Sequence, residues 1–282
     1  MARPGVAERP ARRVVGGALA PVAQDAVAVE EPLEIRVAGE AVAITMRTPG
    51  ADAQLAAGFL FAEGIVRSVD DLGTLSHCGR VGEEGYGNVL DVLPAPGVTL
   101  DLERVQATRR GTLTTAACGV CGRRSVEDLL ARVPELAIAE RVPRELVARG
   151  PDLLRAAQGT FSRTGGTHAA ALLGADGAVL AVHEDVGRHN AVDKVVGTLL
   201  LASRLGRPRT PAPGGPPLLL VVSGRSSFEM VQKAAVARIP VLASVGAAST
   251  LAIDLAERAG VTLAAFVRNG TLNVYAHPER LL

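Results

Sequence analysis

The sequence predicts an α/β fold in which a mixed sheet is covered by helices, with a smaller β-rich lobe towards the N-terminus. Two observations support this prediction. Segments with strand and helix patterns alternate over residues 178–275, which indicates parallel or mixed strands joined by helices. In addition, 48% of the 282 residues are hydrophobic but only 2% are aromatic, so a large core is available and must be built from aliphatic side chains.

The β-rich lobe is predicted for about residues 23–110. Residues 33–47 alternate between apolar and polar side chains around a central Ala-Gly-Glu, which is the pattern of a β-hairpin. Asp52 is placed to cap a helix that stops at Gly64. Residues 65–105 have the pattern of short strands between glycine-rich turns.

Residues 1–22 are expected to form a disordered tail, because they are rich in Arg, Pro, Gly and Ala. A secretory signal peptide is the alternative, since Arg12 and Arg13 precede an apolar stretch. Glycines and a proline interrupt that stretch, however, and nothing after it resembles an exported, disulfide-rich domain. No run approaches the roughly 18 apolar residues of a membrane span, so none is expected.

Charge and cysteine content narrow the function classes. Thirty basic and 29 acidic residues give a net charge of +1, which argues against a general nucleic-acid binder. The 3 cysteines cannot all pair, and Cys118 and Cys121 are separated by only two residues, so disulfides do not specify this fold. Reduced thiols indicate a cytoplasmic protein.

The C-terminal α/β lobe is predicted for about residues 151–282. Asn269-Gly270 is a strong signal for a tight hairpin turn, and Ser226 with Glu229 is placed as a helix capping box. The predicted strands are 178–183, 218–223, 240–245, 261–268 and 272–275, and the predicted helices are 143–157, 190–205, 228–238 and 251–259.

A loop is predicted at residues 111–125, which are small, polar and without period, and it carries Cys118-Gly-Val-Cys121. A thiol becomes a nucleophile as thiolate, and three features favour the thiolate here. The pair precedes a predicted helix start at Val126, two arginines follow it, and the second thiol can donate a hydrogen bond to the first. The loop therefore predicts reactive thiols.

Four kinds of site are candidates for this loop. A zinc site, as in a zinc-stapled nucleotide-binding regulator, needs two more ligands, and His77 and Cys78 lie far upstream. A zinc deaminase needs His-x-Glu upstream, but Gly79 occupies the Glu position, so that signature fails. A dithiol-disulfide oxidoreductase and a sulfur carrier that holds a persulfide remain, and the cysteine pair alone does not decide between them.

Polar turns follow three predicted strands of the C-terminal lobe, at 223–227, 244–249 and 268–271. Two of them open onto helix N-termini, where amides, hydroxyls and the helix dipole suit a phosphate or pyrophosphate. Arg225 and Arg268 add positive charge. Each turn alone has an ordinary structural explanation, whereas the three together favour an anionic ligand. The two common nucleotide-binding loops are absent from the sequence.

Titratable side chains are dense in residues 183–194, which read His-Glu-Asp-Val-Gly-Arg-His-Asn-Ala-Val-Asp-Lys. A salt-linked helix cap and a proton-handling site explain this segment equally well, so the roles of His183 and His189 stay open. The same holds for His168, which is either a buried, hydrogen-bonded histidine or a functional one.

Five stretches carry a family resemblance: 58–64, 118–121, 164–168, 183–194 and the region from Ser223 to Thr271. In this order they resemble the formate dehydrogenase accessory sulfurtransferase family (FdhD). The resemblance covers nearly the whole chain beyond about residue 20, and the long histidine-containing string is more specific than the cysteine pair.

The resemblance implies a cytoplasmic sulfurtransferase with a cysteine persulfide intermediate. Family members take sulfur from a cysteine desulfurase and pass it to the molybdenum (or tungsten) bis(molybdopterin guanine dinucleotide) cofactor of formate dehydrogenase. On this chain, Cys118 would be the persulfide residue and Cys121 its partner. The cofactor, as a bound substrate, would contact Phe266, Val267, Arg268, Asn269, Gly270 and Thr271.

The resemblance also implies a fold like the cytidine deaminase core without its zinc chemistry, a homodimer, and no metal ion of the protein's own. It assigns residues 23–282 to one sulfur-carrier domain that contains both lobes and the cysteine loop. Cysteine desulfurase and formate dehydrogenase are the implied partners, and neither nucleic acid nor a membrane is expected.

Overall fold

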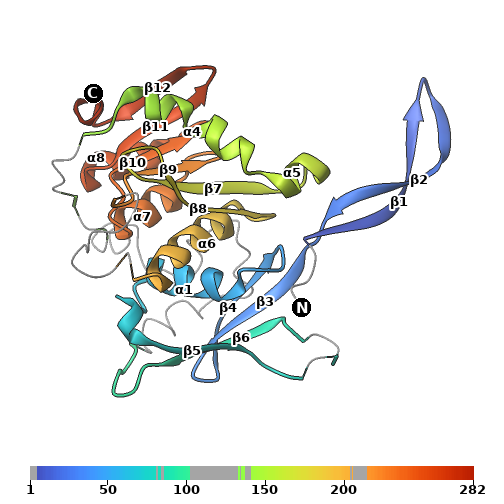
Figure 1. Ribbon diagram of the computed structural model, residues 1–282, viewed down its shortest axis with the longest axis horizontal. Coiled ribbons are helices and arrows are strands. Elements are labelled where there is room, and N and C mark those ends of the chain that lie inside the picture. The colour runs from blue at the N-terminus through green and yellow to red at the C-terminus, as the bar shows by residue number, and fades with distance from the viewer. Residues whose placement is uncertain are drawn as a thin grey trace.

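The computed structural model of the protein describes residues 5–80, 82–83, 86–101, 133, 135–136, 141–203, 205 and 215–282. The strands of this part of the chain form a six-stranded sheet, a four-stranded sheet and a separate two-stranded hairpin (Figure 1). Helices α1 (Asp52–Ala62) and α6 (Arg188–Leu201) lie between the two larger sheets (Figure 1). The predicted α/β class is therefore confirmed. The cytidine-deaminase-like arrangement stays a prediction.

The six-stranded sheet has the order β12-β11-β10-β9-β7-β8. Its three central strands, β9, β10 and β11, run parallel, while β12, β7 and β8 pair antiparallel with their neighbours. The mixed sheet is thus confirmed, although β7 was not predicted, because its three consecutive alanines have low β-propensity. The strands are β7 (His168–Leu173), β8 (Val179–Asp185), β9 (Leu219–Val222), β10 (Val241–Ser244), β11 (Thr262–Arg268) and β12 (Thr271–Ala276).

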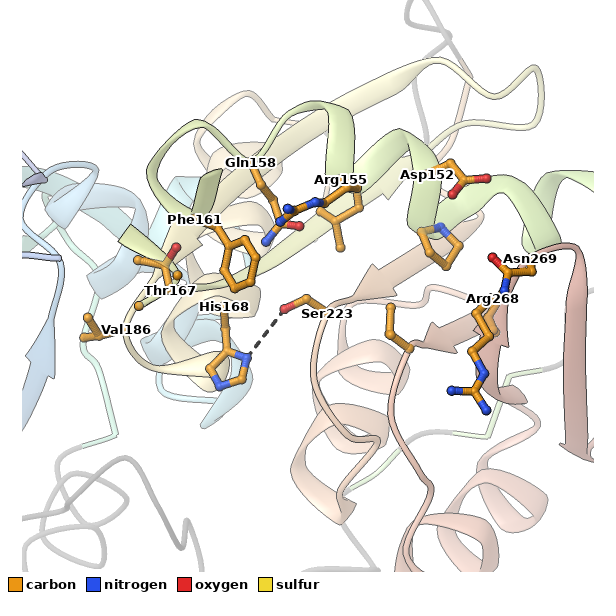
Figure 2. A pocket seen from close by; sticks show the side chains of 16 residues that line it. Asp152, Arg155, Gln158, Phe161, Thr167, His168, Val186, Ser223, Arg268 and Asn269 are labelled. Carbon is orange, nitrogen blue, oxygen red and sulfur yellow. Dashed lines mark hydrogen bonds between the residues drawn. The ribbon is translucent and has the colours of Figure 1, made fainter. Parts of the chain in front are cut away.

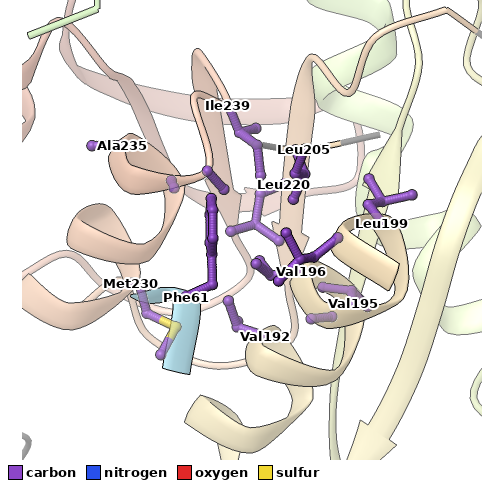
Figure 3. Close-up of a cluster of buried hydrophobic side chains, with 14 of the residues drawn as sticks. Phe61, Val192, Val195, Val196, Leu199, Leu205, Leu220, Met230, Ala235 and Ile239 are labelled. Atoms are coloured by element: carbon purple, nitrogen blue, oxygen red, sulfur yellow. The ribbon is translucent and has the colours of Figure 1, made fainter. Parts of the chain in front are cut away.

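Helices cover both faces of this sheet. Along β9, Leu219 and Val221 belong to the hydrophobic cluster under α4 (Arg144–Ala156), whereas Leu220 and Val222 belong to the cluster on the opposite face. That second cluster includes α1, α6, α7 (Phe228–Val236) and α8 (Thr250–Ala259), and Figure 3 shows part of it around Phe61. A strand buried on both faces needs a continuous apolar sequence, which explains the run at 218–222.

The four-stranded sheet has the order β4-β3-β6-β5 and forms the smaller lobe. In the turn between its first two strands, Ala38 and Gly39 both have positive φ, 49° and 82°, as a tight hairpin turn requires. The predicted hairpin at 33–47 is therefore confirmed. The elements of this lobe are β3 (Glu31–Val37), β4 (Glu40–Arg47), α1, η1 (Val69–Asp71), β5 (Leu72–His77) and β6 (Val89–Pro94); η2 (Pro278–Arg280) lies near the C-terminus.

Asp52 does not cap α1 as predicted. The cap position is Ala51, in left-handed backbone conformation, and no side chain caps the helix. The Asp52 carboxylate instead accepts hydrogen bonds from the guanidinium of Arg47, at 3.0 and 3.2 Å. Arg47 is 1% exposed, so its charge needs this partner, and that requirement outweighs capping.

The expectation of a disordered tail over residues 1–22 is wrong from Val6 onward. Strands β1 (Val6–Val15) and β2 (Ala18–Ala28) pair as an antiparallel hairpin that projects from the body of the molecule (Figure 1). Gly16 and Gly17 form its turn, both with positive φ. The glycines that argued against order are thus the turn residues that a hairpin needs. No helix among the described residues has the length and apolar character to span a bilayer.

Two glycines bring α1 and α6 into close contact. A Cβ atom at Gly58 would overlap the backbone carbonyl of Asp193, and one at Gly197 would overlap the carbonyl of Gln54. Because the obstructing atoms are backbone, neither clash can be relieved by a side-chain rotation. The glycines therefore set the distance between the two helices that separate the sheets.

A buried ion pair between β8 and α6 is hydrogen-bonded to the smaller lobe through Thr48. Lys194 Nζ lies 2.6 Å from Asp185 Oδ2, with side chains 2% and 0% exposed. Lys194 also donates to the carbonyl of Thr48 at 2.8 Å, and the Thr48 N–H donates to Asp185 at 3.2 Å. Thr48 follows β4 directly, so the network ties β8 and α6 to the strand that leads into α1.

His183 is part of the same contact between β8 and α6. Its Nε2 lies 2.8 Å from the hydroxyl oxygen of Thr198, and that hydroxyl donates its only hydrogen to the carbonyl of Lys194. His183 must therefore be the donor, in the neutral form with the proton on Nε2. Burial, with the nearby charge of Lys194, lowers the pKa of His183 to about 4. The role of His183 in this contact is therefore structural.

Replacing Gly58 by alanine is expected to destabilise the protein, because the new methyl group forces α1 and α6 apart. The expected loss of unfolding free energy is about 3 kcal/mol, measured by urea denaturation. Gly159→Ala is the matched control, since a Cβ there meets no atom within 4 Å. Equal stabilities of the two variants would contradict the close contact.

Stability is expected to fall between pH 6.5 and pH 4 through His183. Its pKa is about 4 in the folded chain against an ordinary 6.5, so the unfolded chain binds the proton first and acid favours unfolding. After allowance for partial exposure, the contribution is about 2 kcal/mol. Urea denaturation of His183→Gln, which keeps a donor for Thr198, should give a flatter pH profile over this window than wild type; identical profiles would exclude the assignment.

Candidate functional site

A cavity of about 520 Å³ lies at one end of the six-stranded sheet (Figure 2). Ser223 and Val245, which line it, follow the carboxyl ends of the parallel strands β9 and β10, and Val267 comes from the end of β11. His168 begins β7, which runs antiparallel to β9 and therefore reaches the same end. In open α/β sheets this end is where ligands bind, so the cavity is the candidate site.

The opposite wall of the cavity comes from α4 and α5 (Gly159–Thr164). Arg155 and Phe161 face each other there, with the guanidinium carbon 4.5 Å from the ring centre. This cation–π contact holds the arginine charge against a flat apolar surface. The wall thus offers a positive charge and an aromatic face to a ligand.

Glu184 holds this wall in place. Its carboxylate accepts hydrogen bonds from the backbone N–H groups of Thr160 and Phe161, both at 2.7 Å, and from the hydroxyl of Thr167 at 3.0 Å. A carboxylate at a helix start satisfies N–H groups that otherwise lack partners and complements the helix dipole. Phe161 and Thr167 are thereby fixed at the cavity.

His168 lies in the cavity as a neutral side chain. Burial lowers its pKa, and the nearby positive charge of Arg188 lowers it further. Its Nδ1 is 3.5 Å from the hydroxyl oxygen of Ser223 (Figure 2). That hydroxyl accepts a hydrogen bond from the Ala169 N–H at 2.9 Å, so its own hydrogen is available to His168 or to a ligand.

The segment predicted to bind the cofactor reaches the cavity with half of its residues. Val267, Arg268 and Asn269 line it, whereas Phe266, Gly270 and Thr271 do not. Asn269 and Gly270 both have positive φ, 50° and 73°, which confirms the predicted hairpin turn between β11 and β12. Of the two arginines expected at the sheet end, Arg268 lines the cavity and Arg225 does not.

His189 contacts the start of α7 rather than the cavity. Its Nε2 lies 2.5 Å from Glu229 Oε2. Burial raises the pKa of Glu229, but the hydrogen bond and charge of His189 outweigh it and hold that pKa below its usual value. The predicted capping box of Ser226 and Glu229 is therefore wrong: Ser227 is the cap position, without a side-chain cap, and the glutamate pairs with the histidine instead.

The predicted catalytic residues Cys118 and Cys121 lie outside the described residues, so their roles stay predictions. The third cysteine, Cys78, is half-buried and free. Within the described ranges, no group of His, Cys, Asp or Glu side chains is arranged to hold a metal ion.

Sequence reasoning missed the α4–α5 wall. Arg155 and Phe161 belong to no motif, and their approach depends on how α5 is held by Glu184. One signal was present, since the stretch 164–168 that carries part of the resemblance includes the glycines and Thr167 of this wall.

Comparison with known proteins gives consistent matches over nearly the full length. A sulfur carrier protein FdhD from Anaeromyxobacter dehalogenans (strain 2CP-1) is 60% identical over 276 residues, 98% of this chain and 93% of the relative. The Mycobacterium tuberculosis (strain H37Rv) protein of the same name is 49% identical over 265 residues, 91% of this chain and 92% of the relative.

The fold also matches a solved structure. A protein from Desulfotalea psychrophila, assigned as a formate dehydrogenase accessory protein, superposes with a TM-score of 0.74 over 99% of this chain and 100% of that chain, at 23% identity. Because the sequence identity is low, that match is evidence for the fold alone. The sequence model of the FdhD/NarQ family matches residues 28–282. Together with the two close relatives, this match shows that the chain belongs to the FdhD/NarQ family.

Proposed function

We propose that the protein is a sulfur carrier, a sulfurtransferase that takes persulfide sulfur from a cysteine desulfurase. The sulfur goes to the molybdenum bis(molybdopterin guanine dinucleotide) cofactor required by formate dehydrogenase. The relatives named as sulfur carrier proteins support the role. The observation that carries the cofactor-binding part is the cavity at the sheet end, which contains Val267, Arg268 and Asn269 from the segment that the resemblance assigns to the cofactor.

The proposed sulfur chemistry uses the two loop cysteines. The Cys118 thiolate attacks the outer sulfur of the desulfurase persulfide, the S–S bond breaks, and the desulfurase thiolate leaves. Cys121 then attacks the inner sulfur of the Cys118 persulfide, which releases sulfide to the metal and leaves a Cys118–Cys121 disulfide. An external thiol reductant restores the dithiol.

The cavity is proposed to bind a nucleotide part of the cofactor. Arg155 and Arg268 bring positive charge to it, which suits the pyrophosphate, and Phe161 provides apolar surface for the ring system. The cofactor here is cargo, and the protein is proposed to work as a cytoplasmic homodimer. Residues 23–282 are proposed to act as one sulfur-carrier domain with a cytidine-deaminase-like core, and the relay involves neither nucleic acid nor a membrane.

Incubation with a cysteine desulfurase and cysteine is expected to add one sulfur atom to the protein, because a thiolate poised by the loop attacks the persulfide. Intact-mass spectrometry should detect this gain, and dithiothreitol should remove it. Cys118→Ala should lack it, while Cys78→Ala, the matched control, should retain it. If wild type gains no sulfur and purifies with stoichiometric zinc, a zinc-stapled binding protein replaces this proposal.

Arg268→Ala is expected to weaken guanosine diphosphate binding about tenfold, because one charge-assisted hydrogen bond to phosphate is lost. Isothermal titration calorimetry on the full chain measures the affinity. Arg258→Ala, an arginine of α8 that does not line the cavity, is the control and should bind as wild type does. Unchanged affinity in Arg268→Ala would remove this residue from the site.

A further inference from the structure

We propose that Asp152 is a specificity-determining residue that selects guanine over the other nucleobases in the cavity. This inference rests on the proposed nucleotide site and assigns one of its contacts. Asp152 belongs to α4 and is the only carboxylate among the described residues that line the cavity. In Figure 2 it lies towards the same end of the cavity as Asn269, away from His168 and Ser223.

The Asp152 carboxylate is free to meet a ligand. It is solvent-exposed, and no donor among the described residues bonds it. Arg155, three residues further along the helix, is held against the Phe161 ring instead of pairing with it. An unpaired carboxylate at a cavity wall has two oxygen acceptors and no donor, so it favours ligands that present two neighbouring N–H groups.

Among the common nucleobases, only guanine presents such a pair. Its N1–H and 2-amino group lie side by side and match both oxygens of one carboxylate. Adenine and cytosine place a lone-pair nitrogen beside their amino group, and uracil flanks its single N–H with two carbonyls, so each brings an acceptor against the negative charge. A site built to bond a donor rejects analogues that lack it far more strongly than an apolar pocket rejects a change in size.

The surroundings of Asp152 agree with a base at this end of the cavity. Pro151 lines the cavity beside it and offers apolar surface to a ring. The Asn269 side chain carries an amide donor that suits the guanine carbonyl. The hydroxyl of Ser223 and the neutral His168, towards the other end, are left for polar groups of the nucleotide.

The test compares guanosine, adenosine and xanthosine diphosphates on the full-length wild-type protein and on Asp152→Asn. Xanthine replaces the 2-amino group of guanine by a carbonyl, so an asparagine amide complements it where a carboxylate repels it. Isothermal titration calorimetry should show that Asp152→Asn loses about tenfold or more in guanosine diphosphate affinity and gains a similar factor for xanthosine diphosphate. A merely structural change cannot produce that gain.

Glu145→Gln is the matched control, since it removes an exposed carboxylate from the same helix outside the cavity. Its nucleotide affinities should equal those of wild type. If wild type binds guanosine diphosphate but Asp152→Asn keeps the same preference among the three nucleotides, the role of Asp152 is refuted. The proposed nucleotide site in the cavity is then retained. If wild type binds no guanine nucleotide at all, the proposed cofactor site and this inference both fall.

Discussion

The ion pair between Asp185 and Lys194 is the interaction on which the arrangement of the two lobes depends. Two buried charges are costly to remove from water, and only close pairing with further hydrogen bonds compensates for that cost. Here the backbone of Thr48 supplies the additional partners for both charges. The smaller lobe is therefore held against α6 by a contact that tolerates little displacement, since any separation removes the Thr48 hydrogen bonds that both buried charges need.

The strand that carries Asp185, β8, also shapes the candidate site. Successive side chains of β8 point to opposite faces of the sheet. His183 and Asp185 face α6, whereas Glu184, between them, faces α5 and holds the cavity wall. The dense polar string at 183–194 thus separates into an interlobe contact and a support for the cavity. Sequence reasoning left its role open because the two functions alternate residue by residue.

Local signals predicted the regular elements well. The Ala38-Gly39 and Asn269-Gly270 turns were found because tight hairpins need residues that accept positive φ, and the apolar run at 218–222 was found because both sheet faces are covered. The errors have tertiary causes. Asp52 and Glu229 both carry local capping patterns, but each pairs instead with a buried basic side chain, Arg47 and His189 respectively.

The candidate site was only partly predictable from the sequence. The sheet-end argument found Arg268 and the turn at Asn269, because the carboxyl ends of parallel strands meet at one edge. It missed Asp152 and Phe161, since nothing in the sequence shows that α4 and α5 face that edge. His168 reaches the same edge on the antiparallel strand β7. That strand was not predicted, because its sequence is rich in alanine.

The glycine contact between α1 and α6 has a consequence for how this sequence can evolve. Gly58 and Gly197 each meet the backbone of the opposite helix, so a side chain gained at either position cannot be offset by a smaller residue at the other. Packed positions usually change through paired substitutions, in which one residue becomes larger and its neighbour smaller. Such paired substitutions are not possible at these two glycines. Substitution rates at both sites should therefore be low and independent of each other, although neither glycine contacts the cavity.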